Sequence, residues 1–181
     1  MSKNAGLNNS IRLISGCWRR RRISFPDLPT LKPTQDRIKE TLFNWLSPHI
    51  VDSVCLDLFA GSGSLGFESL SRGASFVSFV DSQREAITAI EQNAVRLSAS
   101  HFDLHRARVP AGLLSFKKKP FDIVFLDPPF DKDLLMPSLE WLKAFHLIRI
   151  DSLIYFEIEK QARKKVDFTG FDIIKDKATK H

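Results

Sequence analysis

Apolar and polar positions along this chain predict strands and helices in regular alternation. Short, largely apolar runs typical of strands buried on both faces occupy residues 54–59, 75–80 and 121–126. Weaker patterns predict further strands near residues 102–105 and 152–158. Apolar residues recur at helical spacing in the segments 34–46, 64–72, 82–97 and 132–146, and Pro137 is expected to interrupt the last of these helices. Strands alternating with helices predict an α/β fold, with a mostly parallel sheet and helices on both faces.

The N-terminal region differs from this pattern. Residues 11–25 (IRLISGCWRRRRISF) alternate between apolar and other residues, which favours a hairpin. Thr34 follows Pro33 and is expected to be the N-cap of the first helix. The chain contains no internal repeat. We therefore predict an N-terminal extension over residues 1–33 and one larger domain over residues 34–181.

Length and composition exclude several classes of protein. With 181 residues, 43% of them hydrophobic, the chain is long enough to bury a core and is not a disordered or fibrous protein. No apolar run approaches the roughly 20 residues of a membrane helix, and the polar start lacks the apolar stretch of a secretory signal. Cys17 and Cys55 lie far apart and form no metal-ligand pattern. We expect a cytoplasmic monomer without a metal site.

The net charge of +6 lies in the first 40 residues. This segment holds nine of the 27 Lys and Arg residues and three of the 21 acids, which leaves 18 of each in the remainder. Such a segment favours contact with a polyanion, because arginine makes forked contacts to phosphate, although a solvated tail is the alternative interpretation. The candidate nucleic-acid-binding residues are Arg12, Trp18, Arg19, Arg20, Arg21 and Arg22.

A glycine-rich segment follows the first predicted strand of the sheet, as DLFAGSGSLG from Asp57 to Gly66. Glycines allow the backbone to turn tightly and to approach a ligand, and the helix that follows presents free N–H groups. Asp57, at the end of the strand, can accept hydrogen bonds from a cationic or hydroxyl-bearing ligand. This spacing also fits a dinucleotide-binding fold or a purely structural turn.

Two further motifs follow strand ends. Asp81 ends the second strand, where an acid can bind the hydroxyls of a ribose or cap the next helix. The sequence Asp127-Pro128-Pro129-Phe130 ends the strand at 121–126. Consecutive prolines fix the backbone rigidly, so that the Asp127 carboxylate and the Pro128 carbonyl can converge on one exocyclic amine. Such hydrogen bonds would aim the lone pair of the amine at an electrophile, while Phe130 stacks on the base.

These motifs together resemble the RsmD family of S-adenosylmethionine-dependent methyltransferases. The resemblance is carried by residues 11–25, by KPTQDRIKETLFNW at 32–45, by LDLFAGSGSLGFESLSRGA at 56–74 and by FDIVFLDPPFD at 121–131. It implies a Rossmann-like methyltransferase fold with a basic N-terminal RNA-binding extension. It also implies methylation of N2 of one guanine in 16S rRNA during assembly of the small ribosomal subunit.

The resemblance also implies roles for single residues. The cofactor S-adenosylmethionine would be cradled by Asp57, Ala60, Gly61 and Gly63, held at its ribose by Asp81, and covered by Thr34 and Asp36. Asp127 and Pro128 would orient the guanine amine, and Phe130 would stack on the guanine ring.

Two segments depart from the family pattern. The loop HRARVPAGLL at 105–114 has no acid or amide for the adenine amine of the cofactor. The chain ends at FDIIKDKATKH, where relatives continue into a closing antiparallel strand, so either that strand is absent or residues 166–174 replace it.

Three alternatives to guanine methylation are weighed. The first is an adenine-N6 methyltransferase acting on DNA or RNA, because the same motif suits that amine. The second is a nicotinamide-dependent oxidoreductase, which leaves the Asp-Pro-Pro-Phe motif unexplained. The third is a non-enzymatic RNA-binding protein with this fold.

Overall fold

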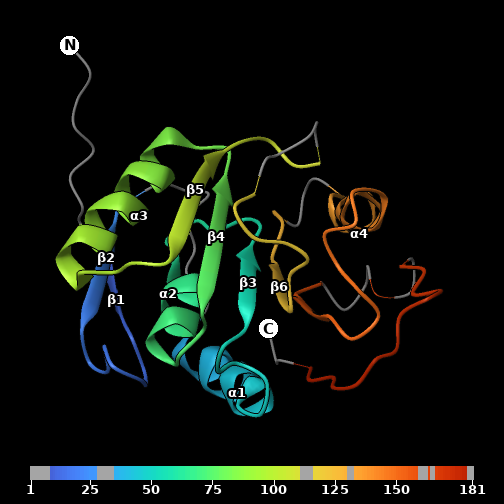
Figure 1. Ribbon diagram of the computed structural model, residues 1–181, viewed down its shortest axis with the longest axis horizontal. Coiled ribbons are helices and arrows are strands. Elements are labelled where there is room, and N and C mark those ends of the chain that lie inside the picture. Colours follow the sequence, from blue (N-terminus) through green and yellow to red (C-terminus); the bar gives the residue numbers. More distant parts are fainter. Residues whose placement is uncertain are drawn as a thin grey trace.

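A computed structural model describes residues 9–27, 35–110, 116–129, 133–158, 163 and 166–178 of the chain (Figure 1). Two strands, β1 (Asn9–Arg12) and β2 (Arg22–Phe25), precede helix α1 (Asp36–Leu46). The chain then alternates through β3 (Val54–Asp57), α2 (Ser64–Ser71), β4 (Phe76–Asp81), α3 (Arg84–Leu97) and β5 (Phe102–Arg106). It continues through β6 (Ile123–Leu126), α4 (Leu135–Ala144) and β7 (Leu153–Phe156).

The main sheet has five parallel strands in the order β5-β4-β3-β6-β7. The chain starts in the centre at β3, builds outward to β5, and returns to the other side of β3 to form β6. The predicted α/β class and parallel sheet are thus confirmed. This order places a topological switch point between β3 and β6, where open parallel sheets bind their ligands.

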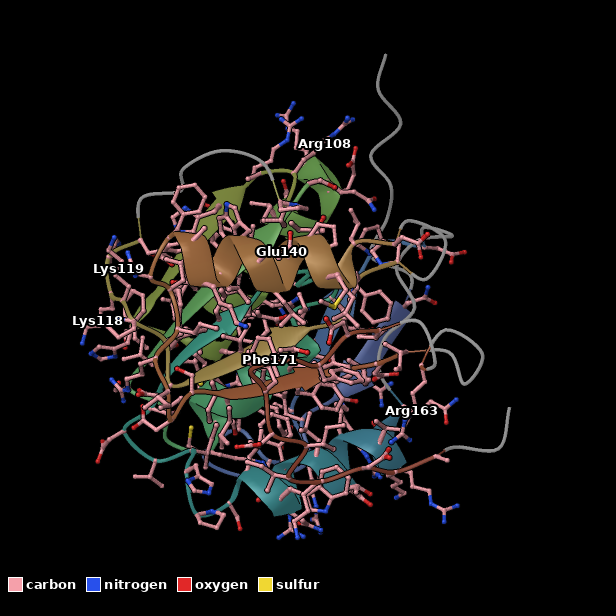
Figure 2. All side chains as sticks on the ribbon, turned by 90° about the vertical axis from the view of Figure 1, so that its right-hand side faces the viewer. Arg108, Lys118, Lys119, Glu140, Arg163 and Phe171 are labelled. Atoms are coloured by element: carbon pink, nitrogen blue, oxygen red, sulfur yellow. The ribbon has the colours of Figure 1, made fainter. Side chains whose placement is uncertain are left out.

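Helices cover both faces of the sheet, as the apolar runs predict. Alternate strand residues such as Cys55, Val77 and Phe125 pack with residues of α1, α2 and α3 on one face. Their neighbours Leu56 and Val124 pack with α4 on the other face. Figure 2 shows α4 with Glu140 and the C-terminal segment with Phe171 on the same side of the molecule. Since the described helices cover both faces, a ligand can approach the sheet at its strand ends.

The predicted hairpin is confirmed, and it packs against the larger domain. β1 pairs with β2 in antiparallel register, and Leu13 and Ile23 are fully buried in the core that includes α1 and α3. Its loop is fixed to α2 by the fully buried Glu68, whose two carboxylate oxygens accept hydrogen bonds from the Ile14 N–H at 2.8 Å and the Ser15 N–H at 3.0 Å. The position of the loop is therefore set by α2.

Two predicted helix features are wrong. The N-cap of α1 is Gln35, and Asp36 begins the helix, so Thr34 is not the cap; Thr34 itself lies outside the described residues. Pro137 does not interrupt a helix, because α4 begins only at Leu135. Proline is tolerated in the first turn of a helix, where its missing N–H would have no intrahelical acceptor.

The C-terminal segment contains no strand within residues 166–178. Phe171 instead packs against the α4 side of the core, with the Lys143 ammonium 3.9 Å from the centre of its ring. In the described part of the chain, β7 is therefore an edge strand without an antiparallel partner. Among the described residues, no helix has the length and apolar character required to span a membrane.

Candidate functional site

The three sequence motifs meet at the carboxyl edge of the parallel sheet. Asp57 ends β3, Asp81 ends β4, and Asp127 follows β6 directly. Because β3 lies between β4 and β6, these three acids come from three adjacent strands around the switch point. The order of the strands in the sheet therefore brings the three motifs to the same edge.

The glycine-rich loop makes a tight turn between β3 and α2. Its bend is closed by the Gly63 N–H, which donates to the Ala60 carbonyl at 2.6 Å. Gly63 has φ of +75°, and a Cβ on it would lie 3.0 Å from Ile90 and 3.1 Å from Phe67. Only glycine combines that backbone conformation with so little space. The loop is therefore held close to α3 and opens at the strand ends.

Asp81 is fixed by two backbone groups. One carboxylate oxygen accepts a hydrogen bond from the Gly61 N–H at 2.8 Å, and the other accepts one from the Gln83 N–H at 2.8 Å. A carboxylate has about four lone-pair sites, so Asp81 can also accept a hydrogen bond from a hydroxyl group of a ligand. Gln83 is the N-cap of α3, so Asp81 stabilises the start of this helix from two residues upstream. This geometry allows both expected roles of Asp81, which are to bind a ribose and to stabilise the start of the next helix.

Asp57 lies behind the loop. Its side chain is almost fully buried, and one carboxylate oxygen accepts a hydrogen bond from the Gly66 N–H at 2.9 Å. This bond connects the end of β3 to the first turn of α2. In the structure, Asp57 therefore supports the loop through which a ligand would be bound.

Asp127 and Pro128 leave the sheet at the end of β6. Asp127 is partly exposed and Pro128 is buried, so the carboxylate is reachable while the backbone beside it is packed. Burial, and secondly the charge of Glu157, raise the pKa of Asp127 to about 7. Phe130, the fourth residue of the motif, lies outside the described residues.

Three acids, Asp57, Asp81 and Asp127, lie at the carboxyl ends of adjacent strands, and the pKa of each is raised. Burial, opposed by the hydrogen bond from the Gly66 N–H and assisted by the charges of Asp127 and Asp81, raises the pKa of Asp57 to about 8. Burial also raises the pKa of Asp81, while the backbone N–H groups of Gln83, Gly61 and Ser82 lower it. A positive ligand would relieve the mutual repulsion of these carboxylates. Among the described residues, no group of three or more His, Cys, Asp or Glu side chains is arranged to hold a metal ion.

Sequence reasoning missed Glu157. Leu126 of β6 is paired with Phe156 of β7, so Asp127 and Glu157 follow paired positions on adjacent strands. The Tyr155 hydroxyl donates a hydrogen bond to Glu157 at 2.7 Å. Glu157 lies near the end of the predicted strand 152–158. An acidic residue at the end of a predicted strand is the sequence feature that could have identified it as a site residue.

Asp36 connects the start of α1 to the hairpin. Its carboxylate lies 3.0 Å from the Arg12 guanidinium and 3.4 Å from the ammonium of the fully buried Lys39. The Lys39 ammonium also donates to the Arg12 carbonyl at 3.1 Å. The residue expected to cover a cofactor and the first residue of the expected RNA surface thus belong to one network.

The other candidate RNA-binding residues differ in exposure. Arg19, Arg20, Arg21 and Arg22 are all exposed. Trp18 is half-buried, and its ring meets Phe67 edge-on with 6.4 Å between ring centres. Trp18 therefore packs against the domain, while the arginines face solvent.

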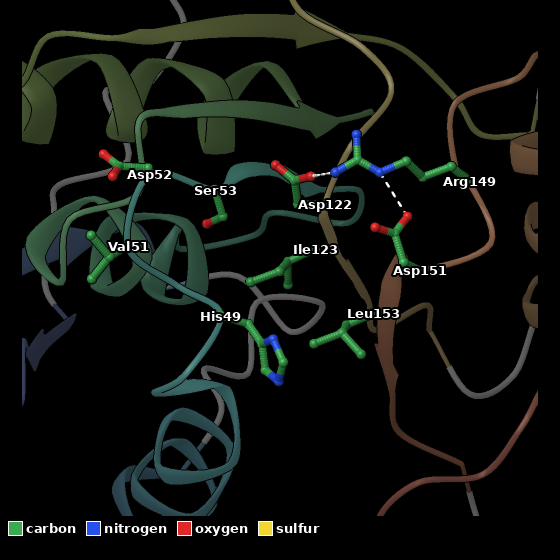
Figure 3. A pocket seen from close by; sticks show the side chains of 9 residues that line it. All are labelled: His49, Val51, Asp52, Ser53, Asp122, Ile123, Arg149, Asp151 and Leu153. Atoms are coloured by element: carbon green, nitrogen blue, oxygen red, sulfur yellow. Dashed lines mark hydrogen bonds and ion pairs between the residues drawn. The ribbon is translucent and has the colours of Figure 1, made fainter.

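A large cavity lies at the opposite edge of the sheet, where the strands begin (Figure 3). It has a volume of about 500 Å³ and is lined by His49, Asp122 and Arg149, among others. The Arg149 guanidinium pairs with Asp122 and with Asp151 (Figure 3). None of the predicted site residues lines this cavity.

Comparison with known proteins shows the family. The model of a family described as "Conserved hypothetical protein 95" matches residues 11–181. "Ribosomal RNA small subunit methyltransferase D" of Escherichia coli K12 is 41% identical over 152 residues, covering 84% of this chain and 76% of the relative. The protein of the same name from Haemophilus influenzae is 40% identical over 175 residues, covering 93% and 89%. The chain belongs to the RsmD family.

A solved structure supports the fold. The structure described as "Putative methyltransferase yhhF from Escherichia coli" superposes with a TM-score of 0.76 at 41% identity, covering 83% of this chain and 82% of that one. The Rossmann-like methyltransferase fold is thus confirmed, and the nicotinamide-dependent alternative is disfavoured. The family match begins at residue 11, so it includes the hairpin except for Asn9 and Ser10 of β1.

Proposed function

We propose that this RsmD-family protein transfers a methyl group from S-adenosylmethionine to the exocyclic N2 of a guanine in 16S rRNA. The observation that carries the proposal is the position of Asp127 and Pro128 at the switch point, one strand away from Asp57 and the glycine-rich loop. The names of its relatives, which are methyltransferases of small-subunit ribosomal RNA, support the substrate class.

The residues at the strand ends fit S-adenosylmethionine. The cofactor carries a ribose, whose hydroxyls suit the free lone pairs of Asp81, and two positive groups, which suit an acidic pocket. Ala60, Gly61 and Gly63 would face it from the loop, which Asp57 supports through Gly66. When bound, the cofactor supplies a methyl group on a positively charged sulfur. Asp36, and Thr34 beside it, would cover it from the start of α1.

Asp127 and Pro128 would orient the guanine amine. The lone pair of that amine is delocalised into the ring, which makes it a poor nucleophile. Hydrogen bonds from its two N–H groups to the Asp127 carboxylate and the Pro128 carbonyl would aim the lone pair at the methyl group. Phe130 would stack on the base, a contact worth roughly 1–3 kcal/mol. Asp127 or water would then accept the proton that the amine releases.

The N-terminal extension, residues 1–33, would bind the RNA. Arg12 and Arg19–Arg22 carry five positive charges on the hairpin, and β1 and β2 pack against the larger domain. The proposed partner is 16S rRNA within an assembling small subunit. In this proposal, the basic hairpin would present the RNA to the methyl-transfer site of the domain against which it packs.

Isotope transfer tests the proposal. Purified protein is incubated with methyl-labelled S-adenosylmethionine and either unmethylated small subunits or DNA, and the product is digested to nucleosides. We expect labelled N2-methylguanosine from the subunits and none from DNA. Labelled N6-methyladenine from either substrate would contradict the guanine assignment. An Asp127→Ala protein is the control for a contaminating activity.

A further inference from the structure

The four consecutive arginines of the hairpin fall into two pairs. The Arg21 guanidinium donates to the Arg96 carbonyl of α3. The Arg22 guanidinium donates to Ser10 of β1, at 2.9 Å to its hydroxyl and 3.2 Å to its carbonyl. Arg21 and Arg22 therefore hold the hairpin together and fix it to the domain. Within the described part of the chain, no hydrogen bond or ion pair engages the guanidinium of Arg19 or Arg20.

Arg19 and Arg20 instead line a pocket. It has a volume of about 220 Å³ and is lined by Arg12, Arg19, Arg20 and Glu40, with Leu13 and Ile14 completing its wall. The lining residues include three arginines and one acid, Glu40, and Arg12 is also paired with Asp36 beside the pocket. Arginine is the side chain best suited to a phosphate, because its planar fork offers paired N–H donors.

The backbone of Arg20 is strained. Arg20 has φ of +69°, a left-handed conformation that favours glycine. Its N–H donates to the Leu13 carbonyl at 2.9 Å, so it closes the hairpin turn. Glycine would make the same turn without strain. Strained backbone clusters at functional sites, and Arg20 is one of the residues that line the pocket.

We propose that Arg12, Arg19 and Arg20 form a clamp for one phosphate group of the substrate RNA, whereas Arg21 and Arg22 are structural. This rests on the proposed function, in which RNA is the substrate. Through its ion pair with Asp36 and the bond from Lys39 to its carbonyl, Arg12 connects the clamp to the start of α1. A phosphate in the clamp would therefore fix the RNA relative to the segment that covers the cofactor.

Arg20→Gly tests the clamp without harming the turn. We expect the melting temperature to stay equal or rise, because the strain is removed. Affinity for a short fluorescein-labelled single-stranded RNA should fall roughly tenfold, and the log–log salt slope should become less steep by about 0.7, the loss of one phosphate contact. Affinity for S-adenosylhomocysteine should not change. Arg20→Gly with wild-type RNA affinity and salt slope would overturn the clamp.

Three further variants give matched comparisons. Lys175→Ala removes an exposed charge from the C-terminal segment and should leave the salt slope unchanged. Arg22→Ala should lower the melting temperature, with a smaller change in slope than Arg20→Gly. Glu40→Gln should raise RNA affinity by roughly twofold to fivefold, since a carboxylate in the pocket repels phosphate. Equal slopes for Arg20→Gly and Lys175→Ala, or a Glu40→Gln protein with unchanged affinity, would place the phosphate elsewhere.

Measurements on the wild-type protein distinguish a failure of the clamp from a failure of the proposed function. If it methylates small subunits but Arg20→Gly methylates them equally well at all salt concentrations, the clamp is wrong and the proposed function stands. If the wild-type protein neither binds nor methylates RNA, the proposed function fails, and the clamp with it.

Discussion

The Asp81 carboxylate accepts a hydrogen bond from the Gly61 N–H at 2.8 Å, which ties the end of β4 to the glycine-rich loop after β3. The second oxygen of the same carboxylate holds the start of α3 through the Gln83 N–H. One side chain thus sets the positions of a loop and a helix that border the proposed cofactor pocket. A ligand hydroxyl bound to Asp81 would meet a group that is already fixed, which reduces the ordering required on binding.

Asp81→Ala should weaken cofactor binding at least about tenfold, because it removes the proposed contact to the ribose and releases Gly61. RNA affinity should change little, since the hairpin is held by other contacts. Titration calorimetry with S-adenosylhomocysteine and fluorescence anisotropy with RNA measure the two affinities. Asp81→Asn retains an acceptor for the Gly61 N–H and should therefore lose less cofactor affinity than Asp81→Ala.

Gly61→Val should weaken cofactor binding more severely than Asp81→Ala. Gly61 has φ of +52°, and a β-branched residue is strained there and fills the loop. Calorimetry with S-adenosylhomocysteine measures the loss. A Gly61→Val protein that binds the ligand normally would show that the loop is only a structural turn.

Asp127→Ala should lower turnover by at least about a hundredfold, comparable to the loss of one oriented group in an oxyanion hole. Turnover should also depend on pH. The pKa of Asp127 is about 7, and only the ionised carboxylate has both oxygens free to accept, so the rate should rise with pH through this value. Asp127→Asn should lack this rise. Single-turnover rates measured across the pH range test both statements.

Glu157→Gln should move the same pH dependence to lower pH. Glu157 raises the pKa of Asp127 by its charge, so removing that charge makes Asp127 ionise more easily. Burial is the larger cause, and therefore the pKa should stay above its ordinary value. Tyr155→Phe is the matched control, because it removes the hydrogen bond to Glu157 but leaves its charge. A pH–rate profile that is identical in Glu157→Gln and wild type would exclude Glu157 from the site.

Local sequence patterns predicted the elements but not their contacts. The apolar runs at 54–59 and 121–126 predicted β3 and β6, because strands buried on both faces need such runs. Asp57, Asp81 and Asp127 were identifiable because each follows a predicted strand. Glu68 was not, since one acid inside a helix gives no sign of its burial or of its bonds to Ile14 and Ser15. Such contacts join residues more than 50 positions apart and depend on tertiary packing.

The free energy of unfolding should fall as pH rises from about 4 to about 8 in the ligand-free protein. Burial raises the pKa of Asp57 to about 8, so in this range the folded chain holds a proton that the unfolded chain has lost. This stabilisation is complete at low pH and is lost as pH passes the folded-state pKa. Asp57→Asn should reduce the pH dependence of the urea midpoint. If the midpoint of Asp57→Asn depends on pH as strongly as that of wild type, Asp57 does not titrate in this range.

Gly16 lies in the hairpin loop, close to the end of α2. The Cys17 N–H donates to the Ser71 carbonyl at 2.8 Å, and a Cβ on Gly16 would lie 1.7 Å from that same oxygen. Gly16→Ala must therefore push the loop away from α2, because neither backbone can yield without breaking the bond. Glu68 would then lose its Ile14 and Ser15 donors, leaving a buried carboxylate with fewer partners, a loss of about 1–3 kcal/mol or more.

Gly73→Ala separates this contact from backbone strain. Gly16 and Gly73 have φ of +80° and +98°, so alanine is strained at both, but a Cβ on Gly73 meets nothing closer than 3.8 Å. We expect Gly16→Ala to lower the melting temperature further than Gly73→Ala and to make the hairpin sensitive to limited proteolysis. RNA methylation should fall while calorimetry shows S-adenosylhomocysteine still binding, because the strand ends are unchanged. Equal effects of the two substitutions on melting and proteolysis would mean that the contact with Ser71 does not fix the hairpin.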